Sequence, residues 1–223
     1  MVEATICVFA KPPVAGKAKT RLAPAIGADR AAALAEAFLR DTLESLRQLS
    51  WASVIIAATE PFERVYLPTD GVWIQPEGTL DERIEAILKK ALQFTPLAFA
   101  IGADSPGLPV RYLEEARRLM VSHDAVVGPS MDGGFYALGV KRYPDGLLQG
   151  VEWSRRTTVE QTMIRLKQYG LSLALLPEWF DIDTVHELLH LENLLAHRLI
   201  DCPHTQAAVD HLRRSKVLAV SEK

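Results

Sequence analysis

The sequence is poor in cysteine, with only Cys7 and Cys202 among its 223 residues. Two cysteines cannot form the disulfide framework that holds a small secreted domain together. Cys7 lies in an apolar run, where a buried free thiol is the default expectation. The start of the sequence does not resemble a signal peptide. We therefore expect a protein of the reducing cytoplasm.

Long apolar runs and an excess of positive charge are also missing. The longest apolar runs are shorter than the roughly 20 residues that span a bilayer. The net charge is −3 at pH 7 and the pI is about 6.1, so no basic field favours nucleic acid. We expect neither a membrane nor a nucleic acid as partner, and a homodimer is among the expected assemblies.

The composition present is that of an ordinary globular protein, with 48% hydrophobic and 24% charged residues. We find no repeat and no linker-like segment, and we predict a single domain over residues 1–223. Strand-like and helix-like segments alternate, which predicts an α/β fold with helices on both faces of a sheet, a Rossmann-like three-layer α/β/α arrangement. The expected strands are 5–10, 53–59, 71–75, 97–104, 124–130, 134–140 and 171–177, and the expected helices are 28–49, 80–94, 110–122, 154–170 and the part of 181–198 that follows a short loop, with a further helical stretch in the tail.

Ligands of such sheets bind at the carboxyl ends of the strands, so polar loops after strands are the places to search. The loop after the first strand holds four cations, Lys11, Lys17, Lys19 and Arg21. Cations at a strand end suit a phosphate-rich ligand, and Gly16 would let the backbone approach it. The loop does not match the P-loop pattern. A solvated basic loop without a ligand is the alternative.

Carboxylates follow later strands. Asp104 ends the strand 97–104 and is a candidate Mg²⁺ ligand, because Mg²⁺ is commonly held by one or two carboxylates and phosphate oxygens. Asp132, in "MDGG", could lie over the same crevice. Asp181 and Asp183, in "FDIDT", share one side of the chain if that segment is extended. Each of these carboxylates could instead form a turn or cap a helix. Helix capping, however, explains only one of Asp181 and Asp183.

The segment "QPEGTLDER" contributes weaker candidates. Gln75 and Gly78, at the end of a strand, could read the edge of a base, and Arg83 could reach a phosphate. Turn formation and helix surface charge explain the same residues equally well.

The pattern "HELLH" at residues 186–190 matches the H-E-x-x-H signature of zinc hydrolases. On a helical wheel, Leu188 and Leu191 lie on one stripe, which must face the core. His186 and His190 lie on the opposite side and therefore point to solvent. We predict that this segment is a supporting helix and not a catalytic zinc site.

Taken in order, five segments resemble one known family. They are "FAKPPVAGKAKTRLAP", "IGADSPGLP", "GPSMDGGFYALGV", "WSRRTTVEQTMIRL" and "DIDT". The sequence resembles the bacterial glycosyltransferase-A-like proteins of unknown function, also described as radical-SAM/selenodomain-associated transferases. It is more distantly similar to the guanylyltransferases for molybdenum cofactor and for 2-phospho-lactate. The resemblance runs from about residue 5 to about residue 195.

This resemblance implies a nucleotide-diphospho-sugar transferase (GT-A) fold with a mostly parallel mixed sheet. It also implies Mg²⁺ or Mn²⁺ as cofactor and an NTP or a nucleotide-sugar as donor. The roles implied by position are donor phosphate binding by Lys11, Lys17 and Arg21, metal binding by Asp104 with Asp181 or Asp183, and an acceptor-facing position for Asp132.

We predict a metal-dependent transferase that moves a glycosyl group from a nucleotide-sugar to a small-molecule acceptor. The metal and the basic loop would neutralise charge on the leaving group. Asp132 would orient or deprotonate the acceptor hydroxyl. The Asp-x-Asp of many sugar transferases is here Gly102-Ala103-Asp104. This departure leaves open a nucleotidyltransferase that releases pyrophosphate, and a nucleotide-binding module without catalysis.

Overall fold

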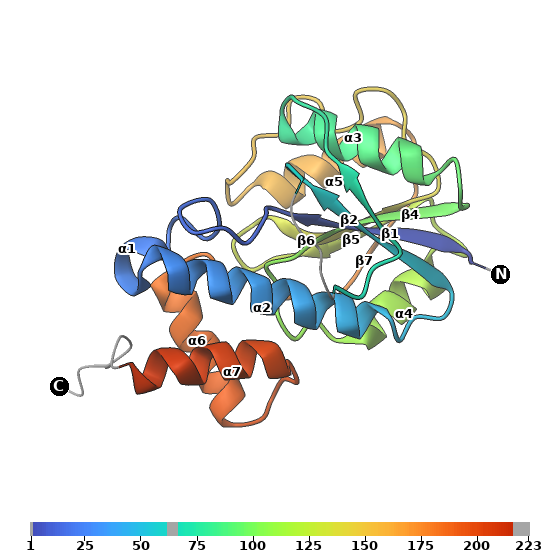
Figure 1. Ribbon diagram of the computed structural model, residues 1–223. Helices are drawn as coiled ribbons and strands as arrows, with labels where there is room; N and C mark the ends of the chain where they lie inside the picture. Colours follow the sequence, from blue (N-terminus) through green and yellow to red (C-terminus); the bar gives the residue numbers. More distant parts are fainter. Residues whose placement is uncertain (1, 62–66, 216–223) are drawn as a thin grey trace.

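A seven-stranded sheet with helices on both faces forms the body of the protein (Figure 1). The computed structural model describes residues 2–61 and 67–215. The predicted α/β fold with a mostly parallel mixed sheet is confirmed. The strands are β1 (Ala4–Ala10), β2 (Ala52–Ala58), β3 (Gly71–Ile74), β4 (Leu97–Gly102), β5 (Ala125–Pro129), β6 (Phe135–Val140) and β7 (Leu173–Leu175).

The strand order is β3-β2-β1-β4-β6-β5-β7. All pairings along β1 are parallel, with β2 on one side and β4 on the other, and β6 is antiparallel to both of its neighbours. The chain leaves β1 toward β2 on one side, whereas β4 lies on the other. A crevice forms at such a switch point in an α/β sheet. The loops after β1 and β4 therefore meet there.

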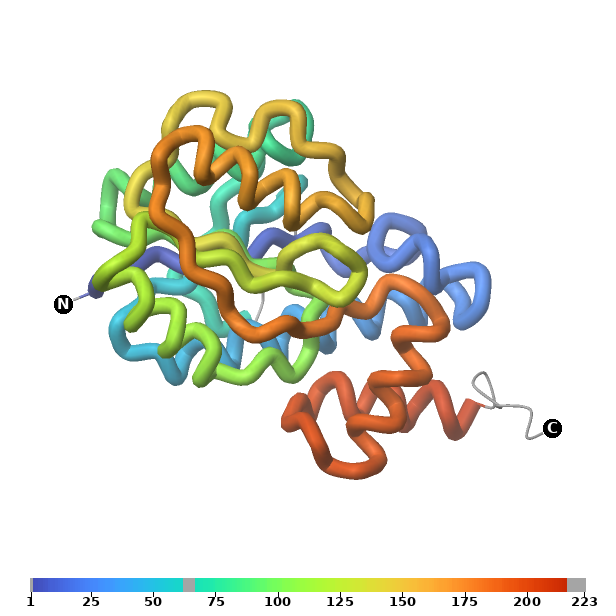
Figure 2. The backbone as a smooth tube through the Cα atoms, turned by 180° about the vertical axis from the view of Figure 1, so that it is seen from behind, coloured from blue at the N-terminus to red at the C-terminus, as the bar shows by residue number. Residues whose placement is uncertain are grey.

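Two layers of helices enclose the sheet. Figures 1 and 2 show α3 and α5 over one face and α2 and α4 over the other, with α6 and α7 as a separate pair beside α2. The helices are α1 (Ala23–Ile26), α2 (Ala28–Leu46), α3 (Leu80–Ala91), α4 (Val110–Leu119), α5 (Thr158–Gln168), α6 (Val185–Ala196) and α7 (Pro203–Arg214).

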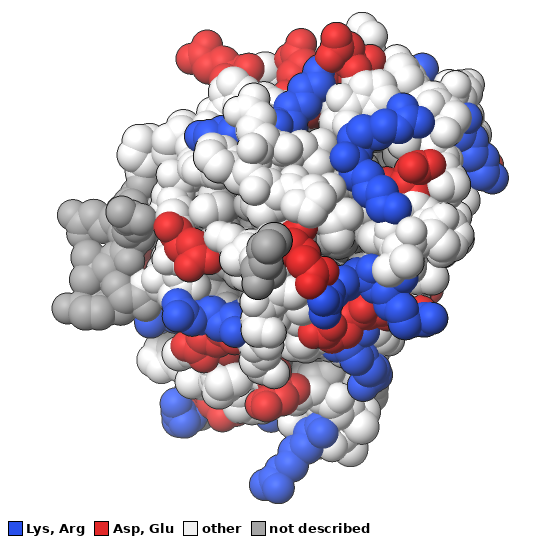
Figure 3. Space-filling view, turned by 90° about the vertical axis from the view of Figure 1, so that its right-hand side faces the viewer, with Lys and Arg blue, Asp and Glu red and all other residues white. Residues whose placement is uncertain are grey.

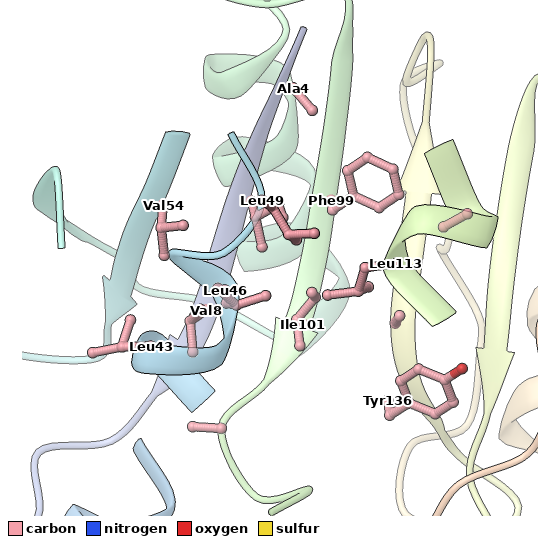
Figure 4. Packing of buried hydrophobic residues seen from close by; sticks show 14 of the residues in the cluster. Ala4, Val8, Leu43, Leu46, Leu49, Val54, Phe99, Ile101, Leu113 and Tyr136 are labelled. Atoms are coloured by element: carbon pink, nitrogen blue, oxygen red, sulfur yellow. The ribbon is translucent and has the colours of Figure 1, made fainter. Parts of the chain in front are cut away.

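The side chains of β1 alternate between the two faces of the sheet, and this alternation determines in which apolar layer each residue packs. Val8 packs with Leu43 of α2 and Leu113 of α4 on one face, and Ile101 of β4 joins them (Figure 4). Cys7, the preceding residue, points to the other face and packs among the residues of α3 and α5. Successive side chains of a strand point to opposite faces, so one apolar strand supplies both layers. The predicted buried free thiol at Cys7 is confirmed.

A third apolar cluster joins α1 and α2 to α6 and α7. Phe38 of α2 packs there with Leu191 of α6 and Val209 of α7. The buried Asp41 carboxylate accepts hydrogen bonds from two backbone amides at the start of α7, the shorter being 2.7 Å from Thr205 N. Phe180 and Ile182 belong to the same cluster, so this packing also anchors the segment before α6 that carries Asp181 and Asp183.

Two of the boundaries that differ from the sequence prediction involve helices α1 and α5. Helix α1 begins at Ala23, within the last two residues of the segment expected to be a basic loop, and runs on to Ile26. The helix predicted from residue 154 begins only at Thr158. Ser154 adopts a left-handed φ of 58°, which a helix does not tolerate. Thr158 Oγ1 donates to Glu152 O at 2.7 Å, and this bond closes the turn instead.

The face of the molecule near the N-terminus mixes both charge signs, as Figure 3 shows. Arg117 pairs there with Glu3, and Arg118 with Glu115. Within the described ranges, no helix combines the length and the apolarity needed to cross a bilayer.

Candidate active site

A cleft of about 560 Å³ lies where the loops after β1 and β4 meet. Its wall combines cations of the first loop with residues of the loops that follow β2, β3, β4, β6 and β7 and with residues of helices α2 and α3. The cations that line it are Lys11, Lys17, Lys19, Arg21 and Arg83. The structure thus brings together five of the predicted phosphate-binding residues, four from the loop after β1 and Arg83 from α3.

Four of these cations have polar ends that remain available at the surface. Lys11 is exposed, and Lys17 forms an exposed ion pair with Glu60 at 2.8 Å. Arg21 is 65% exposed and lies 3.6 Å from Asp183. Arg83 donates to the backbone at the start of its own helix. Exposed pairs of this kind contribute little to stability, so a stronger anionic ligand can displace them.

Lys19 differs from the other cations because its side chain is only 3% exposed. Its ammonium lies 2.8 Å from Asp104 Oδ1 and 3.1 Å from Asp183 Oδ1. Burial alone would lower the pKa of Lys19, but the Asp104 and Asp183 carboxylates outweigh burial and raise it. Lys19 is therefore charged and is committed to the two carboxylates.

Asp104 and Asp183 are the predicted metal ligands that the structure places around one point. Across residues 2–61 and 67–215, no group of three or more His, Cys, Asp or Glu is arranged to hold a metal ion. Mg²⁺ at phosphate-transfer sites is commonly held by one or two carboxylates and completed by substrate oxygens. The pair therefore fits a divalent cation whose remaining ligands come from a bound phosphate.

A second cavity of about 250 Å³ adjoins the first. Both are lined by Phe9, Leu80, Ser154 and Asp183. The other lining residues of the small cavity are mainly apolar or aromatic, and the charged ones are carboxylates. The small cavity is therefore apolar and acidic, whereas the large one is basic.

Three carboxylates line this small cavity: Asp132 and Asp181 line it alone, and Asp183 also lines the large cleft. Asp132 Oδ1 accepts a hydrogen bond of 2.7 Å from Gly134 N, and Asp181 Oδ1 accepts one of 2.9 Å from Ser130 Oγ. Burial raises the pKa of Asp181 to about 6, with a further contribution from the nearby Asp132 charge, while the Ser130 hydrogen bond opposes the shift. Asp181 and Asp183 are thus near neighbours with different partners.

Two candidates from "QPEGTLDER" have structural roles. Gln75 is buried and lines the large cavity, but its amide donates to Ala57 O at 2.7 Å. Gly78 lines neither cavity. It has a φ of +130° and precedes the Thr79–Glu82 capping box of α3, and a Cβ on it would lie 2.3 Å from Glu82 Oε2.

Several residues of the site carry no motif of their own. Phe9, Ser154 and Trp153 line the small cavity, and Ser130 holds Asp181. Trp153 and Ser154 fall within "WSRRTTVEQTMIRL", so only the resemblance could have indicated them. Ser130 precedes "MDGG" and meets Asp181 through a bridge between Ser130 and Trp179.

The "HELLH" segment lies on α6 with both histidines exposed. Glu187 accepts hydrogen bonds from Asp183 N at 2.6 Å and Thr184 N at 2.7 Å. It is therefore part of the capping box of the helix. The prediction of a supporting helix with a solvent-facing histidine side is confirmed.

Residues 42–155 match a family described as "uncharacterized protein conserved in bacteria (DUF2064)". The match covers half of the chain. The chain belongs to this family. No curated protein matches the sequence.

Solved structures give the fold of this DUF2064 member a wider context. A protein from Desulfovibrio desulfuricans G20, provisionally assigned as a nucleotide-diphospho-sugar transferase, is 27% identical with a TM-score of 0.81, covering 96% of this chain and 98% of that one. The 2-C-methyl-D-erythritol 4-phosphate cytidylyltransferase of Thermus thermophilus is 16% identical, with a TM-score of 0.53 and coverage of 87% and 98%. Glucosyl-3-phosphoglycerate synthase of Mycobacterium tuberculosis, solved with Mn²⁺ and UDP, is 9% identical, with a TM-score of 0.53 and coverage of 99% and 82%.

The last two similarities concern the fold alone. Together with the first, they confirm the predicted resemblance to the nucleotide-diphospho-sugar transferase superfamily. The structural neighbours are transferases, both nucleotidyl and glycosyl.

Proposed function

We propose that the protein is a metal-dependent transferase that moves a glycosyl group from a nucleotide-sugar to a small hydroxyl-bearing acceptor. The observation that carries this proposal is the pair of adjoining cavities with opposite charge, which share Phe9, Leu80, Ser154 and Asp183. A donor in the basic cleft and an acceptor in the acidic one would meet at these shared residues.

The basic cleft suits the donor. Its volume of about 560 Å³ falls within the roughly 300–1,000 Å³ of small-molecule sites. Lys11, Lys17, Arg21 and Arg83 surround it with fixed positive charge. Charges arranged before the reaction stabilise the negative charge that develops on a departing nucleoside diphosphate.

Asp104 and Asp183 would hold the divalent cation, Mg²⁺ or Mn²⁺. When bound, such an ion adds positive charge against the donor phosphate oxygens. Both carboxylates reach the cleft, with side chains 52% and 39% exposed. Asp181 is assigned to the acceptor side instead, because it accepts its hydrogen bond from Ser130 and because the Asp132 charge raises its pKa more than the Asp183 charge does.

The acidic cavity suits an acceptor without a phosphate. Its charged lining residues within the described chain are Asp132, Asp181 and Asp183, which would repel an anion. Phe9 and Trp153 offer apolar surface to a sugar ring or a similar body. The pKa of Asp181, about 6, suits a group that accepts a hydroxyl proton near neutral pH. Asp132 would orient the same hydroxyl.

Nucleotidyl transfer is the second candidate. It is favoured by Gly102-Ala103-Asp104, which leaves a single carboxylate where many sugar transferases have two. In that reaction a phosphorylated acceptor attacks the α-phosphate of an NTP, and pyrophosphate leaves.

Product analysis separates the two reactions. The protein is incubated with Mg²⁺ or Mn²⁺, nucleotide-sugars or NTPs, and pooled hydroxyl-bearing and phosphorylated acceptors. Release of UDP or GDP supports glycosyl transfer, and release of pyrophosphate supports nucleotidyl transfer. Asp181→Asn is expected to lower kcat by about 10²–10⁴-fold, the usual contribution of a general base. Asp145→Asn, on a carboxylate that is 95% exposed and remote from both cavities, is the matched control.

Two results would count against the proposal. A thermal-shift panel in which neither nucleotide-sugars nor NTPs bind with Mg²⁺ would refute both reactions. Nucleotide binding without turnover, unchanged by Asp104→Ala, would favour a non-catalytic binding module.

A further inference from the structure

Lys19 lines the cleft, but its ammonium is buried against the carboxylate pair. Its ammonium contacts Asp104 Oδ1 at 2.8 Å and Asp183 Oδ1 at 3.1 Å, with its own side chain 3% exposed. It also donates to Ile182 O at 2.5 Å. The two carboxylates are far more exposed than the ammonium, so their cleft-facing sides remain open to a ligand.

The backbone fixes this inward direction of Lys19. Lys19 has a left-handed φ of 46°, which is uncommon for a residue with a side chain. Its carbonyl accepts hydrogen bonds from Leu22 N at 2.9 Å and Ala23 N at 3.0 Å, which tie it to the start of α1. The ring of Phe38 lies 5.6 Å from the ammonium. An ammonium has three protons, and three acceptors in the protein surround it.

Cationic side chains of the protein therefore balance the charge of the Asp104–Asp183 pair. Asp104 and Asp183 bring two negative charges, Lys19 brings one positive charge, and Arg21 lies 3.6 Å from Asp183 Oδ2. A divalent cation that entered alone would experience two carboxylates and two neighbouring cations. The phosphates of a donor would add the negative charge that is otherwise missing.

We propose that Lys19 is a resident cation that keeps the affinity of the Asp104–Asp183 pair for divalent metal low until donor phosphates are bound. The identity of the donor rests on the proposed function, whereas the low affinity of the free protein does not. Because coupling between two ligands is reciprocal, the metal would also strengthen donor binding.

The test is a titration of the free protein with Mn²⁺, followed by electron paramagnetic resonance of the unbound ion. Lys19→Gln removes the charge and keeps a hydrogen-bond donor, and Lys19→Met removes both. Each variant is expected to bind Mn²⁺ more tightly than the wild type by about 5- to 150-fold, the range of typical coupling between sites. Adding Asp104→Asn and Asp183→Asn to Lys19→Gln should abolish the gain.

Lys89 offers a matched control. It also bridges two carboxylates, Glu85 at 2.6 Å and Asp145, but its side chain is 33% exposed and that of Asp145 is 95% exposed. Lys89→Gln makes the same change of charge at the surface, and it should leave Mn²⁺ affinity unchanged.

The wild type provides a measurement that does not depend on the folding of any Lys19 variant. Its Mn²⁺ affinity should be weak and insensitive to Asp104→Asn. Tight binding that Asp104→Asn abolishes would overturn the proposal. Equal affinity in wild type and folded Lys19 variants, or a gain that persists without the two carboxylates, would do the same. None of these titrations uses a nucleotide, so failure of the proposed transferase activity would be seen separately.

Discussion

Replacing Asp181 by asparagine is expected to stabilise the protein at neutral pH. Burial, helped by Asp132, raises the pKa of Asp181 from 3.8 to about 6. Between these two values the folded state binds more protons than the unfolded state. The free energy of unfolding therefore falls as the pH rises through this window, and the full penalty is present above about pH 6.

The size of the effect follows from the shift. About two pKa units at about 1.4 kcal/mol each give about 3 kcal/mol. Asp181 is only partly buried, and solvent screening reduces this to about 1–2 kcal/mol. Asparagine removes the charge and keeps the oxygen that accepts the 2.9 Å hydrogen bond from Ser130 Oγ. The variant should gain about 1–2 kcal/mol at pH 7.5 and lose most of this advantage near pH 4.

The assay is urea unfolding followed by tryptophan fluorescence at steps between pH 4 and pH 8. Asp124→Asn is the control, and it should change the free energy of unfolding at neutral pH in the opposite direction. Side-chain and backbone hydrogen bonds from Ser172 lower the pKa of Asp124, so its charge stabilises the folded state above its unfolded pKa, and this contribution is lost as the pH falls. An Asp181→Asn variant that is no more stable than wild type at pH 7.5, with a parallel pH profile, would refute the reasoning.

Three further substitutions test other parts of the structure. Asp41→Ala leaves two backbone amides at the start of α7 without their acceptor. It should lower the free energy of unfolding, measured in urea, by about 1–3 kcal/mol. An unchanged urea midpoint would contradict the role of Asp41 in holding α7. Gly133→Ala places a Cβ 2.3 Å from the Arg156 backbone at a φ of +93°. It should lower the free energy of unfolding by at least about 2 kcal/mol, and Gly134→Ala should have a smaller effect in the same assay. His186→Ala changes an exposed side chain. It should alter the free energy of unfolding by less than about 0.5 kcal/mol and leave the zinc content, measured by mass spectrometry, unchanged. Loss of bound zinc in this variant would support the zinc hydrolase hypothesis.

The layers of the fold could be predicted because their signals are local. The apolar run of β1 and the periodicity of α2 depend on residues close together in the sequence. The position of the cleft could also be predicted, since the loops that follow parallel strands share one edge of the sheet. Lys11 and Asp104 can therefore be assigned to this edge from the sequence alone.

The partners within the cleft could not be predicted in the same way. Spacing places Asp181 and Asp183 on one side only in an extended strand. The real segment is held by a bridge at Trp179 and by the capping box of α6, so its two carboxylates meet different neighbours. Nothing in the sequence distinguishes Lys19 from the other cations of its loop. Its inward direction depends on Ile182 and Asp104, which come from distant parts of the chain.

The pKa of Asp181 links stability to the proposed chemistry. At neutral pH a carboxylate at this position is less stable than asparagine would be, so its presence calls for a reason other than stability. A role in proton transfer explains this, because a pKa of about 6 lies close to the working pH of a general base. Asp181→Asn should therefore be more stable and less active at once. A variant that gained stability and kept full transferase activity would remove Asp181 from the mechanism and leave Asp132 as the candidate base.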